Sequence, residues 1–435
     1  MGIVKLGEKN YSRSTPLDCI DNTLAPCAKY IKVDKLTSLF SSLLTMRAAL
    51  RSDFLQRHGF NHDPFETPVA EQELERLWQI FYSYYTPFSG PANLLQELRQ
   101  SSHASVFGTP GQGKSTLRLT LEAECRTVLD GTLAVTYLIG EDILKPLSLD
   151  EHGARLTLAL ARDLLVAILE QFNPLNPPPS VEQIKALQTL LVLGGPLLAR
   201  WLDILTSPLV EADSLWGLSR YWPHVGKAPV RYVENSPALQ ILLKNLKSSP
   251  RDWSGRLATW ETFWQGLEVG QAWGFKRILV LVDGVDSRNR TKEIMLALLE
   301  PLLQQLAAAE EKHLFFKFFL PANLKELFES RCSSLYPHHI FCIMMRWDIE
   351  SLRRLLVQRL RAAAPNRRYT SFNHLAEKGL DLEQNVLQAA AGSPRRLLNI
   401  VNTLIDVHLL NQPQAPLFIR QDWEETLKIL QEDLP

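Results

Sequence analysis

Residues 104–115 read ASVFGTPGQGKS and decide how the rest of the chain is interpreted. The apolar run at 104–107 predicts a buried strand, and residues 115–129 predict a helix. Between them the chain matches the pattern G-x-x-x-x-G-K-[ST], in the strand–loop–helix context that this pattern requires. Glycines let such a loop wrap closely around phosphate groups, and the helix N-terminus supplies N–H donors. The residues expected to surround the phosphates are Gly108, Thr109, Pro110, Gly111, Gln112, Gly113, Lys114, Ser115 and Thr116.

A second apolar run, ILVLVD at 278–283, places a carboxylate at the end of a predicted strand. Lys114 would reach the β and γ phosphates, while Ser115 and Asp283 would hold Mg²⁺, the latter through water. Asp286 follows three residues after Asp283, where it would either polarise an attacking water or cap the next helix. The sequence leaves these two roles of Asp286 open.

The order of these motifs resembles the AAA+ and STAND branches of the P-loop NTPases, including NACHT-like ATPases, over about residues 64–408. In this resemblance the loop is the Walker A motif and the second run is the Walker B motif. It implies an α/β fold, with a three-layer αβα P-loop NTPase core and a C-terminal helical lid. It also implies an ATPase with ATP and Mg²⁺ as cofactors. The chain has Gly284 where AAA+ proteins more often have Glu, and Ser287 where many members of the group have Glu.

The same resemblance assigns roles outside the two motifs. Residues 392–399, GSPRRLLN, resemble the second sensor of AAA+ lids, in which Arg395, with Arg396 as the second choice, would reach the phosphates. Before the core, Phe88 or Tyr85 would either stack on the adenine base or pack as a hinge aromatic.

Two polar candidates follow a third apolar run, LFFKFFLP at 314–321. Asn323 is the nearest candidate for a polar sensor of the γ-phosphate, or it caps the next helix. Arg331 stands in the region where AAA+ rings place an arginine finger that completes the site of the next subunit. An arginine at a helix C-terminus is also ordinary, because it stabilises the helix dipole.

The chain divides into an N-terminal helical region (1–62), the NTPase core (63–345) and the helical lid (346–435). In the core, helical patterns alternate with apolar runs, which predicts a parallel sheet with helices on both faces. A helical insertion at about 175–275 interrupts the alternation and holds seven of the ten tryptophans. It forms either its own small aromatic core or a surface that binds a partner. The predicted strands are 104–107, 133–139, 278–282, 314–320 and 340–345.

Composition limits the classes of function. The 435 residues carry 47 Lys and Arg against 47 Asp and Glu, and 46% are hydrophobic, as in an ordinary folded protein. Five scattered cysteines predict neither a zinc site nor a disulfide framework and fit a reducing compartment. The most apolar run, 187–198, is shorter than the roughly 20 residues that a membrane span needs. We therefore expect a cytoplasmic protein without a membrane segment.

The leading hypothesis is an ATP-binding and ATP-hydrolysing switch or assembly ATPase, with nucleotide held between core and lid. The alternatives are a nucleotide-dependent adaptor with little turnover and an AAA+-type loader or regulator acting on DNA. Expected partners are a protein bound through the insertion or the N-terminal region, and further copies of the chain in a nucleotide-dependent oligomer. Arginines of the lid form either a solvated face or a groove for nucleic acid or a neighbouring subunit. These arginines are Arg346, Arg353, Arg354, Arg359, Arg361, Arg367 and Arg368.

Overall fold

The structure is a computed structural model that describes residues 33–77, 80–171, 178–193, 195–206, 236–247, 258–287 and 290–432. The chain divides into two compact units, Met1–Asp53 and Phe54–Pro435. Helix α1 (Val33–Arg57) runs from the first unit into the second. The strands and all other described helices belong to the second unit.

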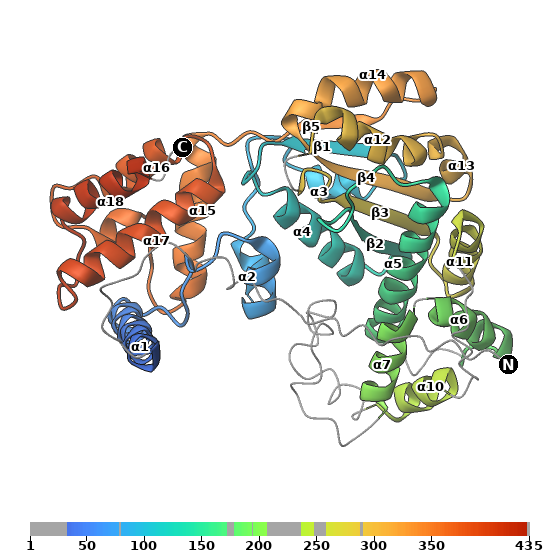
Figure 1. The fold of residues 1–435 in the computed structure, drawn as a ribbon, viewed down its shortest axis with the longest axis horizontal. Helices are drawn as coiled ribbons and strands as arrows, with labels where there is room; N and C mark the ends of the chain where they lie inside the picture. The colour runs from blue at the N-terminus through green and yellow to red at the C-terminus, as the bar shows by residue number, and fades with distance from the viewer. Residues whose placement is uncertain are drawn as a thin grey trace, which may run out of the picture. The chain divides into compact units, whose positions relative to one another are not determined.

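A five-stranded parallel sheet forms the centre of the second unit. Its order is β2-β3-β4-β1-β5, which can be followed in Figure 1. Each strand begins and ends within one residue of the predicted bounds. This order is typical of P-loop NTPases, so the predicted α/β fold class is confirmed. The strands are β1 (Ala104–Gly108), β2 (Thr132–Leu138), β3 (Arg277–Asp283), β4 (Leu314–Pro321) and β5 (Phe341–Met344).

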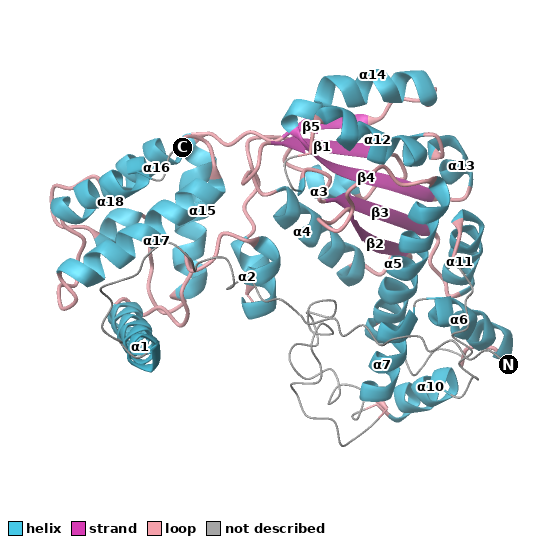
Figure 2. Cartoon of the chain, in the orientation of Figure 1, coloured by secondary structure: helices cyan, strands magenta, loops and turns pink. Residues whose placement is uncertain are grey.

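Helices cover both faces of the sheet, as Figure 2 shows. Alternate residues of a strand point to opposite faces. In β4, Phe315 and Phe319 pack with α3 (Leu94–Leu98) and α4 (Lys114–Thr127) on one face. Phe316 and Phe318 pack on the other face, which confirms three layers. The helices of that second face are α5 (Leu149–Glu170), α11 (Trp260–Ala272), α12 (Lys292–Leu303), α13 (Leu306–Glu311) and α14 (Lys325–Leu335), the last preceded by the 3₁₀ turn η5 (Ala322–Leu324).

The insertion is helical, and in the part that the structure describes its buried tryptophans do not form a separate aromatic core, while the alternative of a partner-binding surface stays a prediction. Trp201 and Trp260 are buried in the same apolar cluster as Val280 of β3. The insertion therefore enlarges the apolar core on one face of the sheet, because its apolar side chains pack in the same cluster as those of α5. Its described helices before α11 are α6 (Val181–Leu193), α7 (Gly195–Leu205) and α10 (Pro237–Lys247). Trp216, Trp222 and Trp253 lie outside the described residues.

Further helices lie before β1 and after β5 in the chain. Before β1 lie α2 (Ala70–Leu77) and the 3₁₀ helix η1 (Phe81–Tyr84). None of the helices in the described ranges has the length and apolar character to cross a membrane. After β5 come α15 (Ile349–Ala363), η6 (Phe372–Leu375), α16 (Leu382–Ala390), α17 (Pro394–Asn411) and α18 (Arg420–Glu432).

Helix α5 and the insertion meet at a glycine, which gives a first testable prediction. A Cβ at Gly153 would collide with the backbone of Thr259 and Trp260 at the start of α11. We expect Gly153→Ala to lower the free energy of unfolding by about 1–3 kcal/mol, because two helices must move apart. Gly270→Ala is the control. Its Cβ would lie 3.4 Å from the nearest side chain, so we expect a stability gain of up to about 1 kcal/mol from helix propensity. Urea titration measures both, and equal stability of the two variants would contradict this packing.

Candidate functional site

The loop between β1 and α4 contains glycines in backbone conformations that other residues rarely adopt. Gly111 and Gly113 have φ angles of 85° and 90°. Helix α4 begins directly after Gly113, so its first N–H groups have no partner within the helix and are available to a ligand. Positive-φ glycines followed by a helix N-terminus are the arrangement that binds phosphate in other proteins. The predicted cradle at 108–115 has this arrangement.

Lys114 is buried at the start of α4, and its ammonium group is already bound within the protein. Its Nζ donates to the Gly108 carbonyl oxygen at 2.9 Å and lies 3.2 Å from Asp286 Oδ2. Burial of a charge is costly unless such partners are present. A phosphate group in the loop would therefore compete with Asp286 for this ammonium group.

Ser115 and Asp283 lie together at the C-terminal edge of the sheet. The Ser115 hydroxyl donates to Asp283 Oδ2 at 3.0 Å, and Asp283 Oδ1 accepts from the Gly284 N–H at 2.8 Å. A hydroxyl and a carboxylate are oxygen ligands of the kind that Mg²⁺ prefers, usually together with waters and phosphates of a substrate. In the described part of the chain, no group of three or more His, Cys, Asp or Glu residues is arranged to hold a metal. The residues therefore fit Mg²⁺ bound with a nucleotide better than a metal held by the protein alone.

Arg118 was not among the predicted site residues, although it contacts the predicted metal ligand. Its Nε donates to Asp283 Oδ2 at 3.0 Å, and its Nη2 donates to Glu71 Oε1 at 2.7 Å. Burial by itself lowers the pKa of Arg118, but the carboxylates of Asp283, Glu71 and Glu122 outweigh burial and raise it. Arg118 stands three residues after Ser115, so the two side chains share one helix face. That spacing is the sequence signal that could have identified it.

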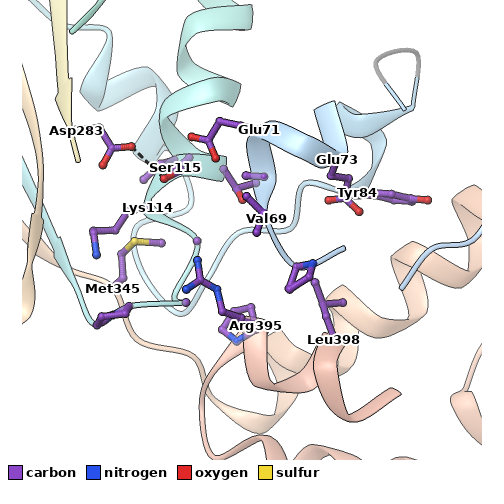
Figure 3. A pocket seen from close by; sticks show the side chains of 18 of the residues that line it. Val69, Glu71, Glu73, Tyr84, Lys114, Ser115, Asp283, Met345, Arg395 and Leu398 are labelled. Carbon is purple, nitrogen blue, oxygen red and sulfur yellow. Dashed lines mark hydrogen bonds between the residues drawn. The ribbon is translucent and has the colours of Figure 1, made fainter. Parts of the chain in front are cut away.

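A cavity of about 620 Å³ lies over these residues. Its walls come from the loop and α4, from the start of α2, from the end of β3 and from the C-terminal helices. Figure 3 shows Lys114, Ser115 and Asp283 on one side of the cavity and Arg395 of α17 opposite. The volume falls within the range of about 300–1,000 Å³ that is usual for small-molecule sites.

The C-terminal helices contact the loop directly. The Arg395 N–H donates to the Gly111 carbonyl oxygen at 3.1 Å, and Trp347 Nε1 donates to the Gln112 carbonyl oxygen at 2.9 Å. The Arg395 side chain points toward the loop in Figure 3. Its guanidinium group has no hydrogen-bond or ion-pair partner among the described residues, whereas Lys114 has two. Arg395 lines the cavity, and its contact with a phosphate stays a prediction.

The other predicted residues differ in their relation to the cavity. Phe88 is buried and lines it together with Tyr85, so base stacking and hinge packing both stay predictions. Asn323 is exposed, does not line the cavity and makes no side-chain cap of η5 or α14. Arg331 forms an ion pair with Glu300 of α12. Pro110, Gly111, Gly113, Lys114, Ser115, Thr116 and Asp286 also line the cavity, whereas Gly108, Thr109 and Gln112 do not.

Several of the seven lid arginines bind groups of the protein itself. Arg353 binds Glu350 and Glu383, and Arg361 donates to the Tyr369 carbonyl oxygen. Two more are engaged in the same way: Arg359 with Glu73 and Arg367 with the carbonyl oxygen of Arg57. Arg346, Arg354 and Arg368 are exposed. Within the described ranges only Arg353 and Arg359 are paired with carboxylates, and Arg361 and Arg367 are exposed as well. A solvated face and a groove for nucleic acid or a neighbouring subunit therefore both stay predictions.

No protein-family model matches the sequence, and no curated protein matches it. Among solved structures, the chain is similar to the Aeropyrum pernix ORC1 protein, whose structure was determined in complex with DNA. The similarity has a TM-score of 0.36 and 13% sequence identity, and it covers 85% of this chain and 67% of that one. The fold class rests on the strand order of the sheet and not on this similarity. The chain has an α/β fold with the parallel strand order typical of P-loop NTPases, followed by C-terminal helices.

Proposed function

We propose that the protein is an ATP-binding and ATP-hydrolysing switch that holds nucleotide between the α/β core and the C-terminal helices. The observation that carries this proposal is the convergence of Lys114, Ser115, Asp283 and Arg395 on one cavity of about 620 Å³. These residues come from three separate segments of the chain. A cation from each side of the cavity and a hydroxyl–carboxylate pair between them suit a nucleoside triphosphate with Mg²⁺.

In this proposal each side chain has one task. The loop N–H groups and Lys114 bind the β and γ phosphates, and Arg395 binds them from the opposite side. Ser115 and Asp283 hold Mg²⁺, which neutralises charge that develops on the phosphates. Asp286 orients the attacking water and accepts its proton. Asp286 can accept this proton only if the Lys114 ammonium group moves from Asp286 to the phosphates. Binding of ATP would therefore free the Asp286 carboxylate.

The contacts of the C-terminal helices with the loop explain how such a site would act as a switch. Arg395 and Trp347 bind backbone oxygens of Gly111 and Gln112, the residues that would face the phosphates. Binding and loss of a phosphate at the loop would favour different positions of these helices, because only the bound state gives the Arg395 guanidinium group an anionic partner. The contact between Arg395 and the phosphate would supply the free energy for the movement of the C-terminal helices.

The first experiment measures binding of a fluorescent ATP analogue and phosphate release by the full chain, with Mg²⁺ and with EDTA. We expect Mg²⁺-dependent binding and turnover. If the protein neither binds the analogue nor releases phosphate, the proposed function is wrong. Mass measurement with a non-hydrolysable analogue would add the oligomeric state, and an oligomer that forms only with nucleotide would favour Arg331 as an arginine finger.

A second candidate function is an adaptor that binds ATP and scarcely hydrolyses it. The observation in its favour is that Gly284 stands where a glutamate is more usual, while Asp286 is engaged by Lys114. Asp286→Asn separates the two functions. For a hydrolysing switch we expect phosphate release to fall about 100-fold or more, as for loss of a general base.

In that variant the affinity for ATP should be kept or increased, because Lys114 no longer has a charged competitor for the phosphates. Glu293→Gln, which removes an exposed carboxylate at the start of α12, serves as the control. An equally slow rate in wild type and Asp286→Asn would favour the adaptor.

A further inference from the structure

Helix α2 carries two glutamates that bind arginines from different segments. Glu71 accepts from Arg118 of α4 at 2.7 Å, and Glu73 binds Arg359 of α15 through both carboxylate oxygens, at 2.6 and 2.7 Å. Both glutamates line the cavity, as Figure 3 shows. Helix α2 is therefore ion-paired on one side to the helix of the phosphate loop and on the other side to the C-terminal helices.

Arg118 extends these contacts to the predicted metal ligand. Its Nε and the Ser115 hydroxyl both donate to Asp283 Oδ2, each at 3.0 Å. The side chain of Arg118 is only 2% exposed, so it has little freedom to move. Arg118 therefore orients the Asp283 carboxylate together with Ser115 and the Gly284 N–H, and Glu71 is one of the acids that hold Arg118.

A guanidinium group beside a metal-binding carboxylate has an electrostatic cost. It competes for the carboxylate oxygen and repels a divalent cation, unless another acid offsets its charge. Glu122 is 3.6 Å from Arg118 but is also bound by Arg126 and by the Thr136 hydroxyl. Glu71 is therefore the acid most free to neutralise Arg118.

We infer that Arg118 and Glu71 are positioning residues for Asp283, and that Glu71 sets the affinity of the site for Mg²⁺. The inference rests on the proposed function, since it requires ATP and Mg²⁺ in this cavity. Groups that orient a metal ligand from behind typically change metal affinity by 10–100-fold when they are lost. Glu71 is 26% exposed, which places the expected effect at the lower end of that range.

The test is a Mg²⁺ titration of fluorescent ATP-analogue binding to the full chain, beside a measurement in EDTA. In Glu71→Gln the Mg²⁺ concentration for half-maximal effect should rise about tenfold. In EDTA the same variant should bind the analogue as tightly as wild type or more tightly, because the uncompensated Arg118 attracts the phosphates. This opposite response of metal and metal-free binding is not produced by a general loss of structure, which weakens both.

Two further variants complete the experiment. Glu75→Gln removes an exposed carboxylate from the same helix and should behave as wild type. Glu71→Asp keeps the charge and should restore most of the Mg²⁺ affinity. If Glu71→Gln titrates like wild type, or weakens binding equally with and without Mg²⁺, the inference is overturned while the proposed function stands. If wild type itself binds no ATP, the proposed function fails first.

Discussion

Replacing Lys114 by alanine should weaken ATP binding by roughly 100-fold. The ammonium group is buried at the start of α4 and has partners on two sides, so a phosphate would meet a cation that is largely shielded from solvent. Loss of one partner of a buried charge pair typically costs 2–5 kcal/mol, and about 2.8 kcal/mol corresponds to a factor of 100. Equilibrium titration with a fluorescent ATP analogue in Mg²⁺ measures the change.

The control for Lys114→Ala must distinguish the loss of a contact in the site from a change in the net charge of the protein. Lys145 is exposed in the loop after β2, and Lys145→Ala changes the net charge by the same amount. We expect its ATP affinity to match wild type. Thermal unfolding of Lys114→Ala should show a folded protein, because a small side chain at this position leaves Asp286 access to water. An unchanged ATP affinity of Lys114→Ala would show that the loop is not the nucleotide site.

The sheet was predictable because its strands are short apolar runs bounded by turn residues. Residues 278–283 and 314–321 are buried almost throughout, so their sequences need no alternation of polar and apolar side chains. The pairing of Ser115 with Asp283 followed from the same prediction. In a parallel sheet the C-terminal ends of β1 and β3 lie at one edge, although β4 separates the two strands.

The role of α2 was not predictable, because it depends on ion pairs between segments that are distant in sequence. Glu71 lies 47 residues from Arg118, and Glu73 lies 286 residues from Arg359. In the sequence, glutamates of a short helix form the same pattern whether their side chains face solvent or bind a buried arginine. The core that the insertion joins was not predictable for a related reason: the sequence shows that Trp201 and Trp260 favour burial but not which core they join.

Arg359→Ala should lower the free energy of unfolding by about 3–5 kcal/mol, the loss expected when one partner of a buried ion pair is removed. Arg359 and Glu73 are each only 6% exposed. The guanidinium group also donates to the Pro64 carbonyl oxygen at 2.6 Å and lies 4.5 Å from the centre of the Tyr84 ring. The substitution leaves the Glu73 carboxylate and this carbonyl oxygen buried without their donor. Urea titration of the full chain measures the loss.

The matched control is Arg354→Ala, an exposed arginine on the same helix, which should change stability by no more than about 0.5 kcal/mol. The double variant Glu73→Leu with Arg359→Met should recover much of the loss, because apolar side chains of similar size often replace a buried ion pair without penalty. Such a variant would be folded, yet α2 would no longer be ion-paired to the C-terminal helices. If it then binds ATP with a wild-type Mg²⁺ requirement, α2 needs only the contact between Glu71 and Arg118 to position Asp283. If the Mg²⁺ concentration for half-maximal effect rises, the position of α15 influences the orientation of Asp283 through α2.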